Sequence, residues 1–139
     1  EHATVFGNLY GTEKESVVKN LREGINVILE IDWQGAQQIK SRISSCVMIF
    51  LIPPSKEVLL KRLKNRGTDS DQEIEYRFNQ AVLDLEQSSM FDYVLVNDIL
   101  DTTEEKLKTI ISAERMRLSQ QPDIVDSIRQ LNNEFEDRK

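Results

Sequence analysis

The sequence predicts an α/β fold in which a parallel β-sheet is flanked by helices. Apolar segments rich in β-branched residues at 27–35, 47–52 and 93–96 have the character of buried strands. Longer segments with apolar residues at helical spacing separate these strands. Helices between consecutive strands favour right-handed crossovers, so the strands should run parallel. At 139 residues the chain has the length of one domain.

The opening segment, residues 1–12, is expected to form short strands joined by tight turns. Apolar and aromatic residues are mixed there with glycine and asparagine turn formers. Thr12 precedes Glu15 by three residues, which is the spacing of a capping box, so a helix should start at this point. Gly24 should end that helix as a glycine just past its last turn.

The predicted strand 27–35 contains two acidic residues, Glu30 and Asp32, near its end. An unpaired buried carboxylate is unfavourable, so these side chains should face a cleft. Ligands of open α/β sheets bind at the carboxyl ends of the strands, which makes Asp32 the first functional candidate. Alternatively, Asp32 caps the next helix near residues 33–36, where the helix dipole favours a negative charge.

The elements expected after residue 35 continue the alternation of helices and strands. They are a helix at 36–43, a strand at 47–52, a helix from Ser55 to about Gly67, a helix beginning at Ser70, a strand at 93–96, a helix at 102–119 and a charged tail at 121–139. Ser55 is the expected N-cap of its helix, and Ser70 forms a capping box with Glu73.

The composition excludes several classes of protein. The net charge of −6 comes from 24 acidic and 18 basic residues, which disfavours a general nucleic-acid binder. The single cysteine, Cys46, cannot form an intramolecular disulfide, and no signal peptide or long apolar span occurs. We therefore expect a cytoplasmic protein with no membrane partner. His2 is the single histidine, so no second histidine is available as a zinc ligand, and the sequence argues against a zinc site.

Three arginines could form an anion site. Arg62 and Arg66 are four residues apart on one predicted helix, and Arg77 lies in the next helix. Planar guanidinium groups bind phosphate oxygens through two donors and keep their charge when water is excluded. The alternative is that these residues lie on solvated helix faces and pair with nearby acids.

Several motifs together resemble the bacterial type of guanylate kinase. They are, in order, EHATVFGNLYGT, ILEIDWQGAQQIK, FLIPPS, RLKNRGTDSDQEIEYRF and FDYVLVND. The resemblance covers essentially the whole chain and implies the P-loop nucleoside monophosphate kinase fold, with a small β region for GMP and a helical lid. It also implies transfer of the γ-phosphoryl group of ATP to GMP with Mg²⁺, giving ADP and GDP.

The resemblance assigns GMP-binding roles to residues of the first third of the chain. Glu1 resembles the carboxylate that reads the ring N–H and amino group of guanine. AMP would leave this carboxylate without a hydrogen-bond partner, which would weaken binding by about 1 to 3 kcal/mol. Thr12 resembles a hydroxyl that touches the base, and Tyr10 a phenol that binds the GMP phosphate. Asp32, with Glu30 two residues before it, resembles the acidic strand end near GMP and the metal.

The remaining assignments concern the transferred phosphoryl group and ATP. Arg62, Arg66 and Arg77 resemble the arginines of the lid, where closure would bring positive charge to the phosphates. With Asp32 they form the expected catalytic set. Arg62 and Arg66 are also expected to bind ATP, as is Asn97, which resembles a residue beside the adenine. No residue is expected to bind the metal directly.

The resemblance also implies that an N-terminal part is absent. The five glycines form neither GxxxxGK(S/T) nor GxGxxG. We expect the P-loop to precede this sequence, and the 139 residues alone to be catalytically inactive. The expected division is 1–26 for the rest of the GMP region, 27–61 for core, 62–78 for the lid region, 79–120 for core and 121–139 for a C-terminal helix.

The expected partners are GMP and ATP, and the tail from Gln121 could pack on a second copy in a homo-oligomer. The alternative function is that of the guanylate-kinase-like modules of membrane-associated scaffold proteins, which bind phosphorylated partners without catalysis. Those modules typically lose nucleotide or lid residues, whereas the candidates named above are in place. A third alternative is a purely structural α/β fragment.

Overall fold

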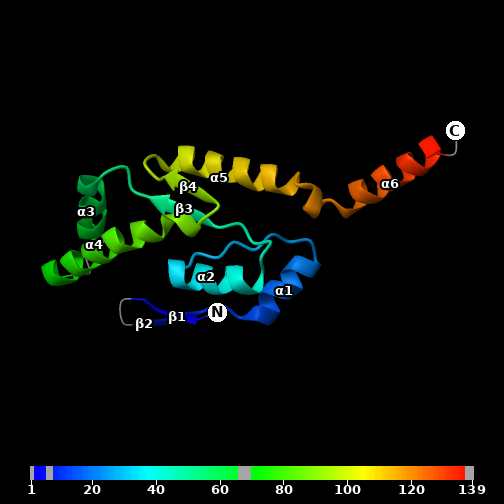
Figure 1. Ribbon diagram of the computed structural model, residues 1–139. Helices are drawn as coiled ribbons and strands as arrows, with labels where there is room; N and C mark the ends of the chain where they lie inside the picture. The colour runs from blue at the N-terminus through cyan, green and yellow to red at the C-terminus, as the bar shows by residue number, and fades with distance from the viewer. Residues whose placement is uncertain (1, 6–7, 66–69, 137–139) are drawn as a thin grey trace. The chain divides into compact units, whose positions relative to one another are not determined.

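The computed structural model describes residues 2–5, 8–65 and 70–136 (Figure 1). The chain divides into two compact units, Glu1–Val96 and Asn97–Lys139. The first unit contains a β-hairpin, a parallel strand pair and four α-helices, and the second contains two α-helices, counted over the described residues. Because the candidate GMP-binding residues lie in the first unit, its local structure decides most of the functional argument.

The chain opens with the expected hairpin. Strand β1 (His2–Val5) pairs antiparallel with β2 (Asn8–Gly11), and His2 lies opposite Gly11 in the register. Figure 1 shows this hairpin beside helix α2 (Trp33–Arg42), and contacts between β1 and α2 confirm that they are neighbours. The prediction of a small β region at the front is therefore confirmed.

Helix α1 (Lys14–Arg22) begins later than predicted. Its N-cap is Glu13, whose side chain makes no capping hydrogen bond, so the predicted capping box of Thr12 and Glu15 is wrong. Thr12 lies one residue before the cap position. Gly24 has a φ of 75° and follows the helix end, as predicted. The left-handed backbone alone favours glycine there, because a Cβ would meet no atom within 4 Å.

The predicted strand at 27–35 is not formed in the structure. Residues 25–32 have no regular secondary structure, and α2 begins at Trp33. The segment keeps an alternating pattern, because Val27 and Leu29 are half-buried whereas Ile28 is 79% exposed. An extended segment becomes a strand only when a neighbour accepts its backbone hydrogen bonds, and none of the described strands pairs with it.

The parallel pair confirms the other two predicted strands. Strand β3 (Ile49–Ile52) runs parallel to β4 (Tyr93–Val96), and Ile49 aligns with Tyr93. The rings of Phe50 and Phe91 pack with centroids 4.8 Å apart next to this pair. The connection between the strands carries helices α3 (Lys56–Asn65) and α4 (Asp71–Leu85) and the 3₁₀ helix η1 (Glu86–Met90). This strand–helix–strand order fixes the α/β character of the first unit.

Both predicted serine caps of this connection are present. The Oγ of Ser55 accepts a hydrogen bond from the N–H of Val58 at 3.3 Å. Ser70 and Glu73 form the complete capping box at the start of α4, with reciprocal bonds of 3.3 and 2.7 Å. Sequence spacing predicts these caps well because each bond joins residues only three positions apart.

The second unit consists of α5 (Leu100–Arg115), the 3₁₀ helix η2 (Leu118–Gln120) and α6 (Pro122–Glu136). Helix α5 begins two residues before the predicted start, and the predicted tail is helical over most of its length. Thr103 is buried in α5, where its Oγ1 donates to Asn97 Oδ1 at 3.2 Å. In the described part of the chain, no helix is both long enough and apolar enough to span a membrane.

Candidate functional site

A shallow hollow of about 320 Å³ lies where the hairpin passes into α1. Its polar lining includes Thr12, Ser16 and Asn20, and its apolar lining includes Val17, Val27 and Leu29. The extended segment 25–32 therefore forms one wall of the hollow even though it is not a strand. A planar, polar-edged ligand such as a nucleobase suits a hollow with apolar walls and a few hydrogen-bonding groups.

Thr12 lies in the lining of this hollow and is half-buried. Asn20 donates from Nδ2 to the backbone oxygen of Ser16 at 2.9 Å, so part of its hydrogen-bonding capacity is already used within α1. The main-chain oxygen of Asn20 also accepts from Ile25, at 3.0 Å, which ties the helix end to the extended segment. The bond between Ile25 and Asn20 therefore attaches segment 25–32 to α1, and no β-ladder with a described strand contributes to this attachment.

Asp32 caps helix α2, as the alternative interpretation of its position predicted. Its Oδ1 accepts from the backbone N–H of Gly35 at 2.9 Å, and its Oδ2 accepts from Gln34 Nε2 at 3.0 Å. Gly35 permits the close approach, since a Cβ there would lie 3.3 Å from Asp32 Oδ1. Both carboxylate oxygens are thus oriented by their own helix. Glu30, two residues earlier, is exposed.

The lid arginines lie partly outside the described residues. Arg62 is half-buried near the end of α3 and Arg77 is half-buried in α4, while Arg66 lies outside the described part of the chain. Helices α3 and α4 contact each other, and Lys56 Nζ lies 5.1 Å from the ring centroid of Phe78 across that contact. The structure therefore brings two of the three arginine-bearing segments together.

Electrostatics at the start of α4 follow from its cap. The backbone N–H and the hydroxyl of Ser70 lower the pKa of the Glu73 carboxyl, and the charge of Arg77 adds to this shift. Arg77 lies one helical turn after Glu73, so its positive charge acts on this carboxylate as well as on any anion bound near the same face of the helix.

Three further candidate residues are only partly defined by the structure. Glu1 lies outside the described residues, and Tyr10 is defined only by its backbone position in β2, opposite Ala3. Asn97 belongs to the second unit, where its Oδ1 accepts from Thr103. The assigned roles of these residues in binding GMP and ATP therefore stay predictions.

Sequence reasoning missed a contact that anchors the hairpin. Gln38 Nε2 donates to the backbone oxygen of His2 at 2.7 Å, and the N–H of His2 donates to Gln38 Oε1 at 3.3 Å. The only local signal was the polarity of Gln38 beside the apolar positions of α2. Such a signal does not identify a partner 36 residues away.

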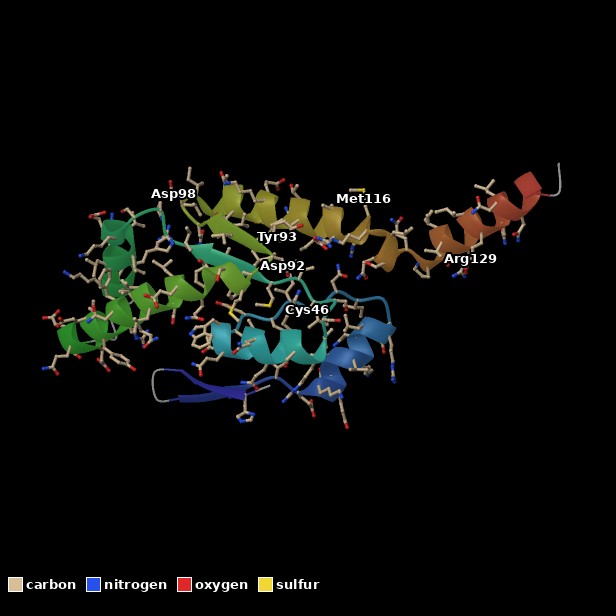
Figure 2. All side chains as sticks on the ribbon, viewed as in Figure 1. Cys46, Asp92, Tyr93, Asp98, Met116 and Arg129 are labelled. Atoms are coloured by element: carbon tan, nitrogen blue, oxygen red, sulfur yellow. The ribbon has the colours of Figure 1, made fainter. Side chains whose placement is uncertain are left out.

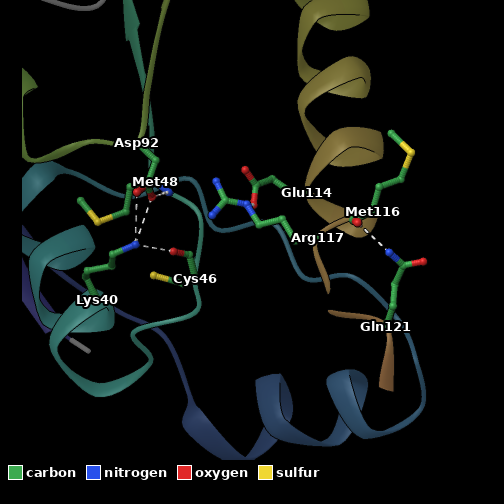
Figure 3. Close-up of polar contacts among 8 residues, drawn as sticks. All are labelled: Lys40, Cys46, Met48, Asp92, Glu114, Met116, Arg117 and Gln121. Carbon is green, nitrogen blue, oxygen red and sulfur yellow. Dashed lines mark hydrogen bonds and ion pairs between the residues drawn. The ribbon is translucent and has the colours of Figure 1, made fainter. Parts of the chain in front are cut away.

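A second missed cluster joins α2 to the parallel pair (Figure 3). Lys40 Nζ lies 3.0 Å from Asp92 Oδ2 and donates to the backbone oxygen of Cys46 at 2.7 Å. Asp92 Oδ2 also accepts from the N–H of Met48 at 2.8 Å. Figure 2 shows Asp92 next to Tyr93, the first residue of β4. The cluster therefore fixes the start of both parallel strands.

This cluster holds structure together and does not supply a nucleophile. Burial raises the pKa of the Cys46 thiol, although the nearby charge of Lys40 acts in the opposite direction. A thiol with a raised pKa is a poor nucleophile at neutral pH because the reactive form is the thiolate. Lys40 and Asp92 hold backbone groups of two different elements, which is a structural role.

The described residues do not form a metal centre of their own. No group of three or more His, Cys, Asp or Glu side chains that could hold a metal ion occurs among them. The oxygens of Asp32 already accept protein hydrogen bonds. Mg²⁺ commonly binds through substrate phosphates and water with only one or two carboxylates, so a nucleotide-bound ion needs no such cluster.

The parallel β3–β4 pair and the helices that connect its strands define an α/β protein. The first comparison supports this class: the chain superposes on guanylate kinase from Anaplasma phagocytophilum with a TM-score of 0.74 and 32% identity, over 86% of this chain and 57% of that chain. The fold is that of the P-loop nucleoside monophosphate kinases.

Sequence comparisons identify the family. The guanylate kinase family model matches residues 1–114. The guanylate kinase of Salmonella paratyphi A is 48% identical over 128 residues, which is 92% of this chain and 62% of that protein, and that of Escherichia coli shows the same values. The chain belongs to the guanylate kinase family. It spans 62% of the length of these two curated relatives.

Proposed function

We propose that the natural protein containing these residues transfers the γ-phosphoryl group of ATP to GMP, giving ADP and GDP. The observation that carries this proposal is the match of residues 1–114 to the guanylate kinase family. The hollow beside Thr12 supports it, because the residue that resembles a base-binding hydroxyl lines a space of suitable chemistry. The same proposal carries the expectation of a cytoplasmic location, where both nucleotides are metabolised.

On the GMP side, five residues have proposed roles. Glu1 reads the guanine edge, Thr12 touches the base from the lining of the hollow, and Tyr10 binds the GMP phosphate. Asp32 supplies fixed negative charge at the start of α2, with Glu30 nearby in sequence. The cap bonds of Asp32 support its role, because a carboxylate held by its own helix needs little reorganisation during the reaction.

On the ATP side, the proposal uses positive charge from the lid region, residues 62–78. Phosphoryl transfer requires positioning and stabilisation of charge on the transferred oxygens more than covalent chemistry. Arg62, Arg66 and Arg77 supply that charge on closure, and Asn97 lies beside the adenine. Mg²⁺ bound to ATP would neutralise phosphate charge, held chiefly by the phosphates and water.

A product assay tests this proposal. The natural protein is incubated with ATP, Mg²⁺ and GMP, and the nucleotides are separated and quantified. We expect ADP and GDP to form in equal amounts. Binding of GMP with no GDP formed at any ATP concentration would contradict the proposal and favour a non-catalytic guanylate-kinase-like module.

A further inference from the structure

The hairpin is attached to α2 by one side-chain amide. Gln38 donates to the carbonyl oxygen of His2 at 2.7 Å and accepts from the N–H of the same residue at 3.3 Å. A single glutamine therefore satisfies both backbone groups of one residue of β1. In a β-ladder a neighbouring strand would do this, so Gln38 substitutes for a strand at the edge of the hairpin.

His2 is well placed to control the candidate GMP site. It follows Glu1 directly in the sequence, and it lies opposite Gly11 in the hairpin register. Gly11 in turn lines the hollow and precedes Thr12. Fixing the backbone of His2 therefore restrains the attachment points of both residues that are proposed to contact guanine.

The position of Gln38 in α2 connects the hairpin with Asp32. Gln38 belongs to α2, the helix whose N-cap is Asp32. Helix α2 thus supports Asp32 at its start and the hairpin one and a half turns further along. A change in the position of α2 would move the acidic residue and the base-binding hairpin together.

We propose that Gln38 is a positioning residue for GMP, which holds β1 against α2 so that Glu1 and Thr12 act on the same base. This inference rests on the proposed function and extends it to a residue that does not itself touch the nucleotide. It requires an amide at position 38, because the side chain must donate to one backbone group of His2 and accept from the other.

Two variants separate this role from simple packing. Gln38→Ala removes both hydrogen bonds. Gln38→Glu keeps the size and one acceptor, but it places a carboxylate oxygen against the carbonyl oxygen of His2, which is unfavourable. If Gln38 only filled space, Gln38→Glu would behave like the wild type. The matched control is Gln37→Ala, which removes the exposed glutamine next to it in α2.

The experiment uses the natural protein and measures the KM for GMP, the KM for ATP and kcat. We expect both Gln38 variants to raise the KM for GMP about tenfold, with Gln38→Glu at least as impaired as Gln38→Ala. The KM for ATP should stay within about twofold of the wild type in both. Hydrogen exchange of the amides in residues 2–11 should become faster, and Gln37→Ala should change none of these values.

Two results would overturn the inference. One is a wild-type KM for GMP in Gln38→Glu, and the other is an equal rise of both KM values, which would indicate general damage to the fold. Absence of GDP formation by the wild-type protein would have a different meaning. It would contradict the proposed function itself, and the role of Gln38 in GMP binding would fall with it.

Discussion

Asp32 has an observed structural role, as the N-cap of α2, and a proposed chemical role. The carboxylate caps α2 by accepting from Gly35, so its position is fixed by local backbone structure. The sequence alone left a cap and a ligand-facing acid as alternatives, and the structure confirms the cap. The carboxylate is only half-buried, so the capping role is compatible with the proposed contact to the nucleotides.

The substitution Asp32→Asn separates these two roles. Asparagine is as good an N-cap as aspartate, so the free energy of unfolding should change by less than about 0.5 kcal/mol. Loss of the negative charge should lower kcat about a hundredfold if Asp32 acts on the reacting nucleotides. Thermal unfolding and steady-state kinetics on the same preparation provide the test, and near wild-type turnover would show that Asp32 is only a cap.

Gly24 gives a second prediction at this scale. Its φ of 75° is unfavourable for a residue with a Cβ, although space for the Cβ exists. Gly24→Ala should therefore destabilise the protein by about 1 kcal/mol through backbone strain alone. Gly24→Asn should be milder, because asparagine tolerates the left-handed region better than alanine. Urea denaturation of both variants measures this difference, and equal stability of Gly24→Ala and wild type would contradict the assignment.

At the scale of elements, most predictions that depend on local bonds succeeded, although the capping box of Thr12 and Glu15 did not. The cap of α4 joins Ser70 to Glu73, and the end of α1 depends on Gly24, so short sequence patterns were sufficient. The segment 25–32 failed for the opposite reason. Its apolar, β-branched character is that of a strand, but a strand also needs a neighbouring backbone, which the segment's own sequence does not specify.

The cap of α4 predicts a dependence of stability on pH. Hydrogen bonds from Ser70 lower the pKa of Glu73 in the folded protein, so the ionised carboxylate stabilises the fold. This contribution is complete above the unfolded-state pKa of about 4.3 and disappears as the pH falls through the lower folded-state pKa. Glu73→Gln should therefore be less stable than wild type at pH 7, and the difference should shrink towards pH 3, as measured by urea denaturation.

At the scale of the whole molecule, the order of elements was more predictable than their contacts. The alternation of strands and helices indicated an α/β fold, and the parallel β3–β4 pair confirms it. The links that hold the first unit together were not predictable. Gln38 bonds a residue 36 positions away and Lys40 one 52 positions away, and no sequence spacing identifies such pairs.

The candidate site also had one part that the residues alone predicted and another that they did not. The residues alone made Asp32 a candidate for facing a ligand and the three arginines a candidate anion site, each with a structural alternative, and only the family resemblance connected them with GMP and ATP. Family membership is now shown by the match over residues 1–114. The nucleotide-binding and catalytic roles of all the candidate residues stay predictions, since each depends on a nucleotide contact.

We propose that this chain carries the guanine-reading half of a guanylate kinase, and the preference of the natural protein between GMP and AMP measures this property. The measurement is kcat/KM of the natural protein for GMP and for AMP, at one saturating concentration of ATP with Mg²⁺. We expect a preference for GMP of at least about tenfold, because AMP would leave the carboxylate proposed to read guanine without a hydrogen-bond partner. Equal values for GMP and AMP, or no turnover of GMP, would contradict it.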